Sequence, residues 1–236
     1  MPTPYDKDYF QLVEAQSESS ASVVVPLLCE LLQPSTVVDV GCGIGTWLKY
    51  FPRNGVSEIA GMDGPWVERE TLSIPPSAFE EVDLSRPPEP TRRFDLVVSL
   101  EVAEHLPAES AGPFVDFLTG LGPAVAFSAA IPLQGGSAHV NERWPNYWST
   151  LFAKHGYASF DVIRERIWLD ERIAWWFRQN LILYIDRERV SGYERLAGTP
   201  AREALPLVHP ELYRGHVPGV PPATPPTEVD RNSRRP

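Results

Sequence analysis

The sequence predicts an α/β fold built on a doubly wound, mostly parallel sheet, and three observations support this. The 236 residues suffice for one sizeable domain, and 43% are hydrophobic against 22% charged. Apolar runs typical of strands buried on both faces alternate with helical patterns. The first such run, Val37–Val40, ends at a cluster of glycines that an amphipathic segment follows. Strand, glycine turn and helix together present backbone N–H groups to a ligand.

The composition divides the chain into four parts, and the last is dominated by prolines, threonines and charges. Such a segment cannot bury enough apolar surface to fold, so we expect it to be disordered. The parts are an N-terminal helical arm (residues 1–34), the α/β domain (35–187), a C-terminal extension (188–216) and the Pro-rich tail (217–236).

Within the arm, a helix is predicted over residues 21–32. The polar residues 16–20 before it offer an N-cap, Pro26 interrupts its pattern, and Pro34 ends it.

Seven strands are predicted in the domain, each an apolar run bounded by turn residues. A helix follows the glycine cluster and ends at Gly55, and another begins near Glu104 and continues through residues 114–118. A third is bracketed by Pro145 and Gly156. The predicted strands cover residues 37–40, 56–62, 79–82, 94–100, 124–130, 158–168 and 180–185.

The spacing of the glycines indicates which ligand the loop binds. Asp39-x-Gly41-x-Gly43-x-Gly45 departs from the dinucleotide fingerprint, which needs Gly or Ala where Thr46 stands. The pattern instead resembles motif I of the class I S-adenosylmethionine (SAM) dependent methyltransferases. In that family the acidic residue and the glycines hold the methionine end of SAM.

A second motif resembles the same family. Residues 94–106 read F-D-L-V-x-x-x-E-V-x-E-H-L, which is similar to the motif IV region. The two matches stand in the family's order and spacing. The resemblance implies a Rossmann-like sheet of seven strands whose last strand is antiparallel, SAM as the cofactor, and an N-terminal arm that covers it. The alternative is that the arm only packs against the domain.

The residues expected to bind SAM lie at the ends of the first strands. Asp63 ends the second strand, where a carboxylate can accept hydrogen bonds from both ribose hydroxyls, although it also suits a simple turn. The resemblance places an Asp after the third strand near the adenine amino group, with an apolar neighbour on the ring. The predicted SAM-binding residues are Asp39, Gly41, Cys42, Gly43, Gly45, Asp63, Asp83, Leu84 and Leu100.

His139 is the predicted catalytic base, because it lies on the loop after the fifth strand, where an acceptor pocket is expected. An imidazole titrates near neutral pH, which suits proton transfer; the alternative is that His139 only structures the loop. Asn141 and Glu142 are predicted to orient it or to bind the acceptor. Glu101, just past the fourth strand, is expected to face the sulfonium or the acceptor. For His105 a structural role is favoured.

The stretch from Gly135 to Trp148 resembles bacterial methyltransferases of natural-product and surface-polysaccharide gene clusters. That resemblance implies a small-molecule acceptor, a sugar or a secondary-metabolite intermediate, methylated on a hydroxyl or an amine. A magnesium site of His139, Glu142 and Glu101 would suit a sugar O-methyltransferase. The sequence lacks the paired aspartates of that group, so no metal ligand is predicted.

Composition restricts the partners. A net charge of −10 argues against a nucleic-acid partner, and the two cysteines form neither a disulfide framework nor a zinc motif. No signal peptide or apolar run of membrane-spanning length is visible, so a cytoplasmic protein without a membrane partner is expected. A homodimer is compatible with the sequence, which carries no signal for the oligomeric state. Two alternative functions stay open, an NAD-dependent oxidoreductase and a non-catalytic SAM-binding protein.

Overall fold

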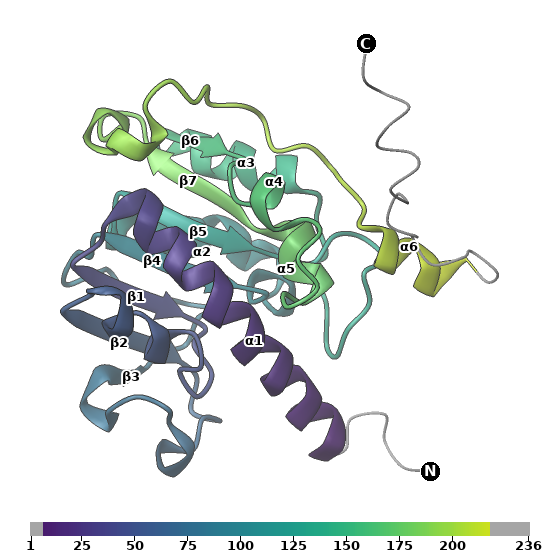
Figure 1. Cartoon of the computed structure of the whole chain (residues 1–236). Helices are drawn as coiled ribbons and strands as arrows, with labels where there is room; N and C mark the ends of the chain where they lie inside the picture. Colours follow the sequence, from purple (N-terminus) through teal and green to yellow (C-terminus); the bar gives the residue numbers. More distant parts are fainter. Residues whose placement is uncertain (1–6, 218–236) are drawn as a thin grey trace.

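The computed structural model describes residues 7–217 and contains one seven-stranded sheet (Figure 1). The strands lie in the order β3-β2-β1-β4-β5-β7-β6, and β7 alone runs antiparallel to its neighbours β5 and β6. This confirms the predicted Rossmann-like, doubly wound sheet. The strands are β1 (Thr36–Val40), β2 (Glu58–Asp63), β3 (Phe79–Glu81), β4 (Leu96–Leu100), β5 (Ala124–Ser128), β6 (Tyr157–Phe160) and β7 (Ile182–Asp186).

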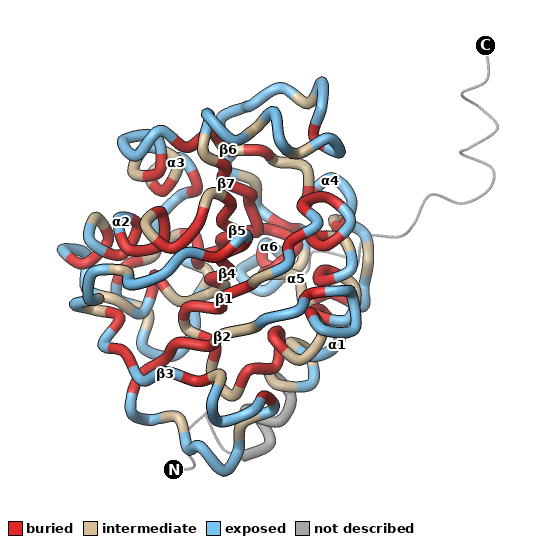
Figure 2. The backbone as a smooth tube through the Cα atoms, turned by 90° about the vertical axis from the view of Figure 1, so that its left-hand side faces the viewer, coloured by how far each residue is buried: buried red, intermediate tan, exposed pale blue. Residues whose placement is uncertain are grey.

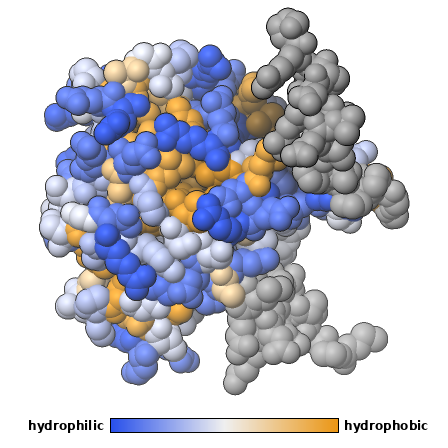
Figure 3. Space-filling view, in the orientation of Figure 1, coloured by the Kyte–Doolittle hydropathy of each residue, from blue (hydrophilic) through white to orange (hydrophobic). Residues whose placement is uncertain are grey.

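Helices cover both faces of the sheet, as the view along its edge shows (Figure 2). Helices α1, α4 and α5 supply buried side chains to one core layer, and α2 and α3 supply them to the other. On the face that carries α1 and α5, hydrophobic residues show in a central area bordered by hydrophilic ones (Figure 3). The helices are α1 (Lys7–Leu32), α2 (Ala111–Leu121), α3 (Pro145–Lys154), α4 (Arg164–Ile167), α5 (Trp175–Asn180) and α6 (Pro210–His216).

The central strands are mostly apolar because both of their faces are covered. In β1, Val37 packs into the layer beneath α1, whereas Val38 and Val40 pack into the layer beneath α2 and α3. All three side chains are fully buried. The chain proceeds outward from β1 to β3 and then returns to β4 beside β1. Ligands bind at such a reversal, beyond the carboxyl ends of the strands.

Helix α1 is longer than predicted and does not begin at residues 16–20. It starts by Lys7 and continues through Pro26 without a break. Pro26 is exposed, so the carbonyl that loses its hydrogen bond to the missing N–H lies on the solvent side. The opposite side of the helix carries Val24, Val25 and Leu28, all fully buried. Burial of this face outweighs the local cost of the proline.

The segment after the glycine loop was predicted as a helix but consists of two 3₁₀ turns, Leu48–Tyr50 and Pro52–Asn54. Pro52 lacks the N–H that a continuous helix would need there. Gly55 ends the segment at φ +91°, in the left-handed conformation expected of it.

Two further predictions of local structure are wrong. The predicted strand 158–168 ends at Phe160, because Ile163 and Ile167, four residues apart, bury one side of a short helical segment. The helix expected to begin near Glu104 is a single 3₁₀ turn, Ala103–His105, and α2 starts only after Pro107.

The predictions for the two ends of the chain fall largely outside the described residues. Of the predicted Pro-rich tail, all but Val217 lies outside the described residues, as do the first six residues of the arm. Within residues 7–217, no helix combines the length and the apolar character needed to cross a membrane.

Candidate active site

The glycine loop leaves β1 in a conformation that only glycine adopts readily. Gly41, Gly43 and Gly45 have φ values of +86°, +53° and +84°. The carboxylate of Asp63, at the end of β2, accepts hydrogen bonds from the N–H groups of Gly43 and Gly64, both at 2.7 Å. The loop is thereby attached to the neighbouring strand, and its backbone faces open space.

Replacing Gly41 with alanine is expected to destabilise the fold by about 2–5 kcal/mol, from the strained φ and a steric clash. A Cβ there would lie 2.3 Å from Cγ2 of Val102. Gly43→Ala is the matched control: its Cβ would meet nothing within 4 Å, so only the strain of about 1–2 kcal/mol applies. Urea denaturation of both variants measures the difference. Equal losses would contradict a clash at Gly41.

Two cavities meet at this loop, of about 500 Å³ and about 770 Å³. Both contain Gly41, Glu101 and His105 in their walls, so they form adjoining arms of one site. The smaller arm also includes Asp63, Trp66, Asp83, Leu84 and Ser85. The larger arm also includes Cys42, Gly43, Leu100, Glu104, His139, Trp175 and Trp176.

Most of the predicted cofactor residues line these arms, and two do not. Gly45 packs against Ile74, where an added Cβ would lie 2.9 Å from the side chain. Asp39 is buried within β1 beneath the loop. Asp83 is exposed, and hydrogen bonds from the side chain and the N–H of Ser85 lower the pKa of its carboxyl.

Asp39 is the most perturbed carboxyl beneath the loop. Burial, and then the negative charge of Asp63, raise its pKa to about 8. Burial and the same two aspartates also raise the pKa of the Cys42 thiol. Cys42 is therefore an unreactive thiol, and its place between the glycines is that of a spacer.

Glu101 lies just past the end of β4, as predicted, and its backbone is unusual. Its φ is +55°, and its N–H donates to the carbonyl and the hydroxyl of Ser128, at 3.0 and 3.1 Å. The side-chain amides of Gln134 and Asn180 donate to its carboxylate, at 2.8 and 3.1 Å. Burial raises the pKa of this carboxyl, while these hydrogen bonds oppose the rise. Such a strained, fully bonded residue is typical of a functional site.

The loop after β5 brings His139 into the wall of the larger arm. Nδ1 of His139 lies 3.0 Å from the carboxylate of Glu142, which also accepts from the N–H groups of Leu133 and Gly135. Asn141 is buried and does not line either arm; its side-chain oxygen accepts from Arg143 at 2.9 Å. The geometry therefore gives Glu142, and not Asn141, a direct contact with His139.

Two residues without an assigned catalytic role also face the larger arm. Glu104 is fully buried, and burial followed by the charge of Glu101 raises the pKa of its carboxyl. His105 packs edge-to-face on His139 with ring centroids 4.8 Å apart; burial, and then His139, lower its pKa. The E-V-x-E-H-L motif contains both residues, but an acidic residue early in a predicted helix suggested compensation of the helix dipole. That turn instead places both side chains in the wall of the larger arm, with Glu104 buried and His105 exposed.

Comparisons with known proteins agree with this geometry. The sequence profile of a family described as "Methyltransferase domain" matches residues 14–161, more than half of the chain. Magnesium protoporphyrin IX methyltransferase from Synechocystis PCC 6803 superposes with a TM-score of 0.55 at 15% identity, over 78% of this chain and 86% of that one. The small RNA methyltransferase HEN1 superposes with a TM-score of 0.50 at 15% identity, over 79% of this chain and 26% of that one.

DesVI of Streptomyces venezuelae is 24% identical over 55% of this chain, with a TM-score of 0.44. The aligned part spans 58% of the length of DesVI. The family match favours methyl transfer over the NAD-dependent oxidoreductase that the glycine loop alone left open. The chain belongs to this methyltransferase family and is a SAM-dependent methyltransferase of the class I fold.

Proposed function

We propose that the enzyme transfers the methyl group of SAM to a hydroxyl of a small metabolite, a sugar or a secondary-metabolite intermediate. The observation that carries this proposal is His139, which lies in the wall of the larger arm and whose Nδ1 is paired with the carboxylate of Glu142. A carboxylate only accepts hydrogen bonds, so the pairing places the imidazole proton on Nδ1 and leaves the lone pair of Nε2 available.

The residues that line the two arms support one orientation of SAM. We propose that its adenosine occupies the smaller arm, where the exposed carboxylate of Asp83 and the apolar side chain of Leu84 suit an adenine. The methionine end then lies along Gly41 and Gly43 in the larger arm, which leaves the space near His139 for the acceptor.

Methyl transfer is an in-line displacement on a carbon already activated by the sulfonium. The protein mainly has to hold the acceptor atom in line with the methyl–sulfur bond. A neutral hydroxyl attacks poorly unless its proton is removed, whereas an amine needs only to be unprotonated. A histidine oriented by a carboxylate can remove the proton of a hydroxyl. A hydroxyl acceptor is therefore favoured over an amine.

The size and chemistry of the larger arm support a small acceptor. Its volume of about 770 Å³ is typical of small-molecule sites, and Trp175 and Trp176 provide flat apolar surface. The acidic balance of the chain disfavours a polyanion such as RNA. One of the structural neighbours is named for a porphyrin acceptor, which is also a small molecule.

The test is an acceptor screen with methyl-labelled SAM. Sugars, hydroxylated natural-product intermediates, matched amines and short RNA duplexes are incubated separately with the enzyme, and label in the product is measured. We expect methyl ethers from one of the hydroxyl classes. Transfer only to RNA or only to amines would overturn the proposal. SAM binding without transfer, with an S-adenosylhomocysteine complex that shows no acceptor space, would favour a non-catalytic SAM-binding protein.

A further inference from the structure

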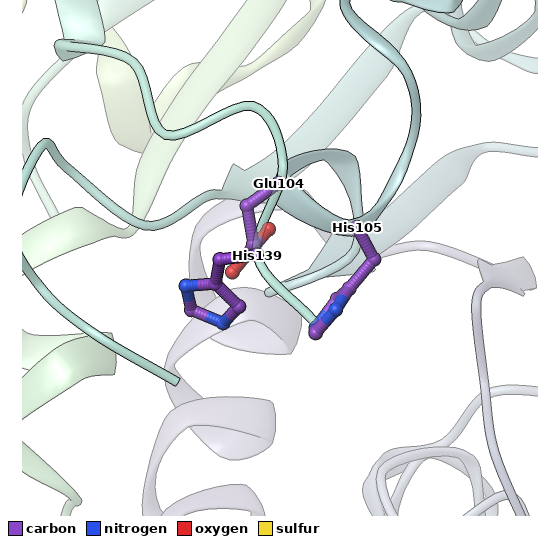
Figure 4. Close-up of side chains that lie close together, drawn as sticks. All are labelled: Glu104, His105 and His139. Carbon is purple, nitrogen blue, oxygen red and sulfur yellow. The ribbon is translucent and has the colours of Figure 1, made fainter. Parts of the chain in front are cut away.

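Three potential metal ligands converge where the loop after β5 meets the turn after β4 (Figure 4). Glu104, His105 and His139 each offer one ligand atom, and these atoms lie within 4.8 Å of one another. The N–H groups of Val140 and Asn141 donate to the carbonyl of Glu104, at 2.8 and 3.0 Å. The backbone thus fixes the two segments together, and the cluster does not depend on a chance meeting of side chains.

Only one of the two carboxylate oxygens of Glu104 has a hydrogen-bond partner among the described residues. The side chain is fully buried, and its Oε1 accepts from the N–H of Ala130 at 3.1 Å. Its Oε2 is also buried and has no hydrogen-bond partner in the described part of the chain. Figure 4 shows the Glu104 side chain between the two histidines. Buried carboxylate oxygens are normally hydrogen-bonded or bound to a cation, so this one indicates a missing ligand.

His139 is oriented as metal-ligating histidines are. Its Nδ1 is paired with Glu142 at 3.0 Å, and the two side chains are 13% and 20% exposed. A carboxylate on one imidazole nitrogen fixes the ring and strengthens the other nitrogen as a ligand. Glu142 therefore contacts His139 but is not itself one of the three residues of the cluster.

The cluster is accessible and has room for further ligands. All three residues line the larger arm, so an ion can enter from the cavity and keep open positions toward the acceptor space. Bonds of about 2.1 Å place neighbouring ligand atoms about 3–4 Å apart, so the atoms must approach slightly. His105 is exposed, which leaves its ring free to make that adjustment.

We propose that Glu104, His105 and His139 bind a divalent first-row transition metal ion that activates the acceptor hydroxyl. Two imidazoles and one carboxylate suit Mn²⁺, Co²⁺ or Zn²⁺ better than Mg²⁺, which prefers oxygen ligands. The inference rests on the proposed hydroxyl acceptor. It also refines the role of His139, whose Nε2 then holds the ion and does not touch the acceptor proton.

The step balances without any further reactant. The acceptor oxygen binds the ion, which lowers the pKa of the hydroxyl, and its proton passes to water. A lone pair of that oxygen attacks the methyl carbon of SAM, and the carbon–sulfur bond breaks. The sulfur keeps the electron pair and becomes the thioether of S-adenosylhomocysteine, and the product is a methyl ether.

The test uses the full chain without a histidine tag, treated with a chelator and desalted. Co²⁺ is titrated in and followed by its visible absorption, and Mn²⁺ binding is measured by calorimetry. We expect one ion per chain, with affinity reduced about tenfold or more in Glu104→Gln and in His105→Ala. His155→Ala is the matched control, because His155 pairs with Asp116 on the surface and lines neither arm. It should bind the ion as the unmodified protein does.

Two results would overturn the site: no binding of either ion by the unmodified protein, or equal binding by all the variants. Circular dichroism and SAM binding by Glu104→Gln establish that this variant is folded. The proposed function is tested separately in the acceptor screen. A hydroxyl methylated at full rate by chelator-treated enzyme would overturn metal activation and leave the acceptor class intact. Metal binding with transfer only to amines would keep the site and overturn the acceptor class.

Discussion

His139→Ala is expected to slow methyl transfer roughly 100- to 10,000-fold while leaving SAM affinity unchanged. The side chain lies in the wall of the larger arm, at the end proposed for the acceptor, so its loss removes activation of the acceptor oxygen. Single-turnover transfer from labelled SAM gives the rate, and calorimetry with SAM gives the affinity.

Glu142→Gln should have a smaller effect, about 10- to 100-fold, because the amide still faces Nδ1 of His139 but loses the charge that orients it. His155→Ala is again the surface control. Unchanged turnover in His139→Ala would show that His139 only structures its loop. A parallel loss of SAM affinity would place His139 in the cofactor site.

The stability of the ligand-free enzyme is expected to fall as the pH rises from about 4 to 8, because of Asp39. The folded chain holds a proton on this carboxyl up to a pKa of about 8, whereas the ordinary pKa of an aspartate is 3.8. The folded state therefore binds more protons in this window, and the contribution to unfolding free energy falls by about 1.4 kcal/mol per pH unit. Between pH 5 and 8 the loss is on the order of 4 kcal/mol.

Asp39→Asn isolates this contribution. The amide fits the same space and has no proton to lose, so the variant should gain stability over the unmodified protein as the pH rises. Urea denaturation without SAM, at pH 5, 6.5 and 8, measures the difference between the two proteins. Other buried carboxyls, such as Glu101 and Glu104, act in both proteins and cancel from it. Parallel stability curves would show that Asp39 is ionised in the folded state.

The sheet and the conformation of the glycine loop were predictable because their signals are local. Within residues 36–64, the apolar runs indicate where β1 and β2 end and hence where Asp63 lies. The spacing of the glycines indicates the tight turn in which they adopt positive φ. The antiparallel last strand came from the family resemblance, since Ile182–Asp186 shows only an apolar run. The contact between Glu142 and His139 could also be predicted, because the two residues are only three positions apart in the sequence.

What the sequence did not indicate depends on distant partners. The helix predicted over residues 21–32 begins at Lys7 and contains no break at Pro26, because its buried face packs against the sheet. The burial of Glu104 is set by the N–H of Ala130 and by the loop after β5, both far along the chain. Without those partners, Glu104 and His105 look like ordinary residues at a helix start.

Helix α1 contributes both to the hydrophobic core and to the wall of the larger arm. Toward its end it is a core element, with Val24, Val25 and Leu28 fully buried against the sheet. Earlier along its length, Glu14 and Ser17 border the larger arm. Glu14 also accepts a hydrogen bond from the buried hydroxyl of Thr46, whereas Ser17 lies at the cavity wall and is not among the buried residues of the helix. A substitution at Ser17 is therefore expected to alter the ligand space with little effect on the packing beneath. Acceptor preference is therefore free to diverge among descendants of such an enzyme through this position of the helix, at little risk to folding.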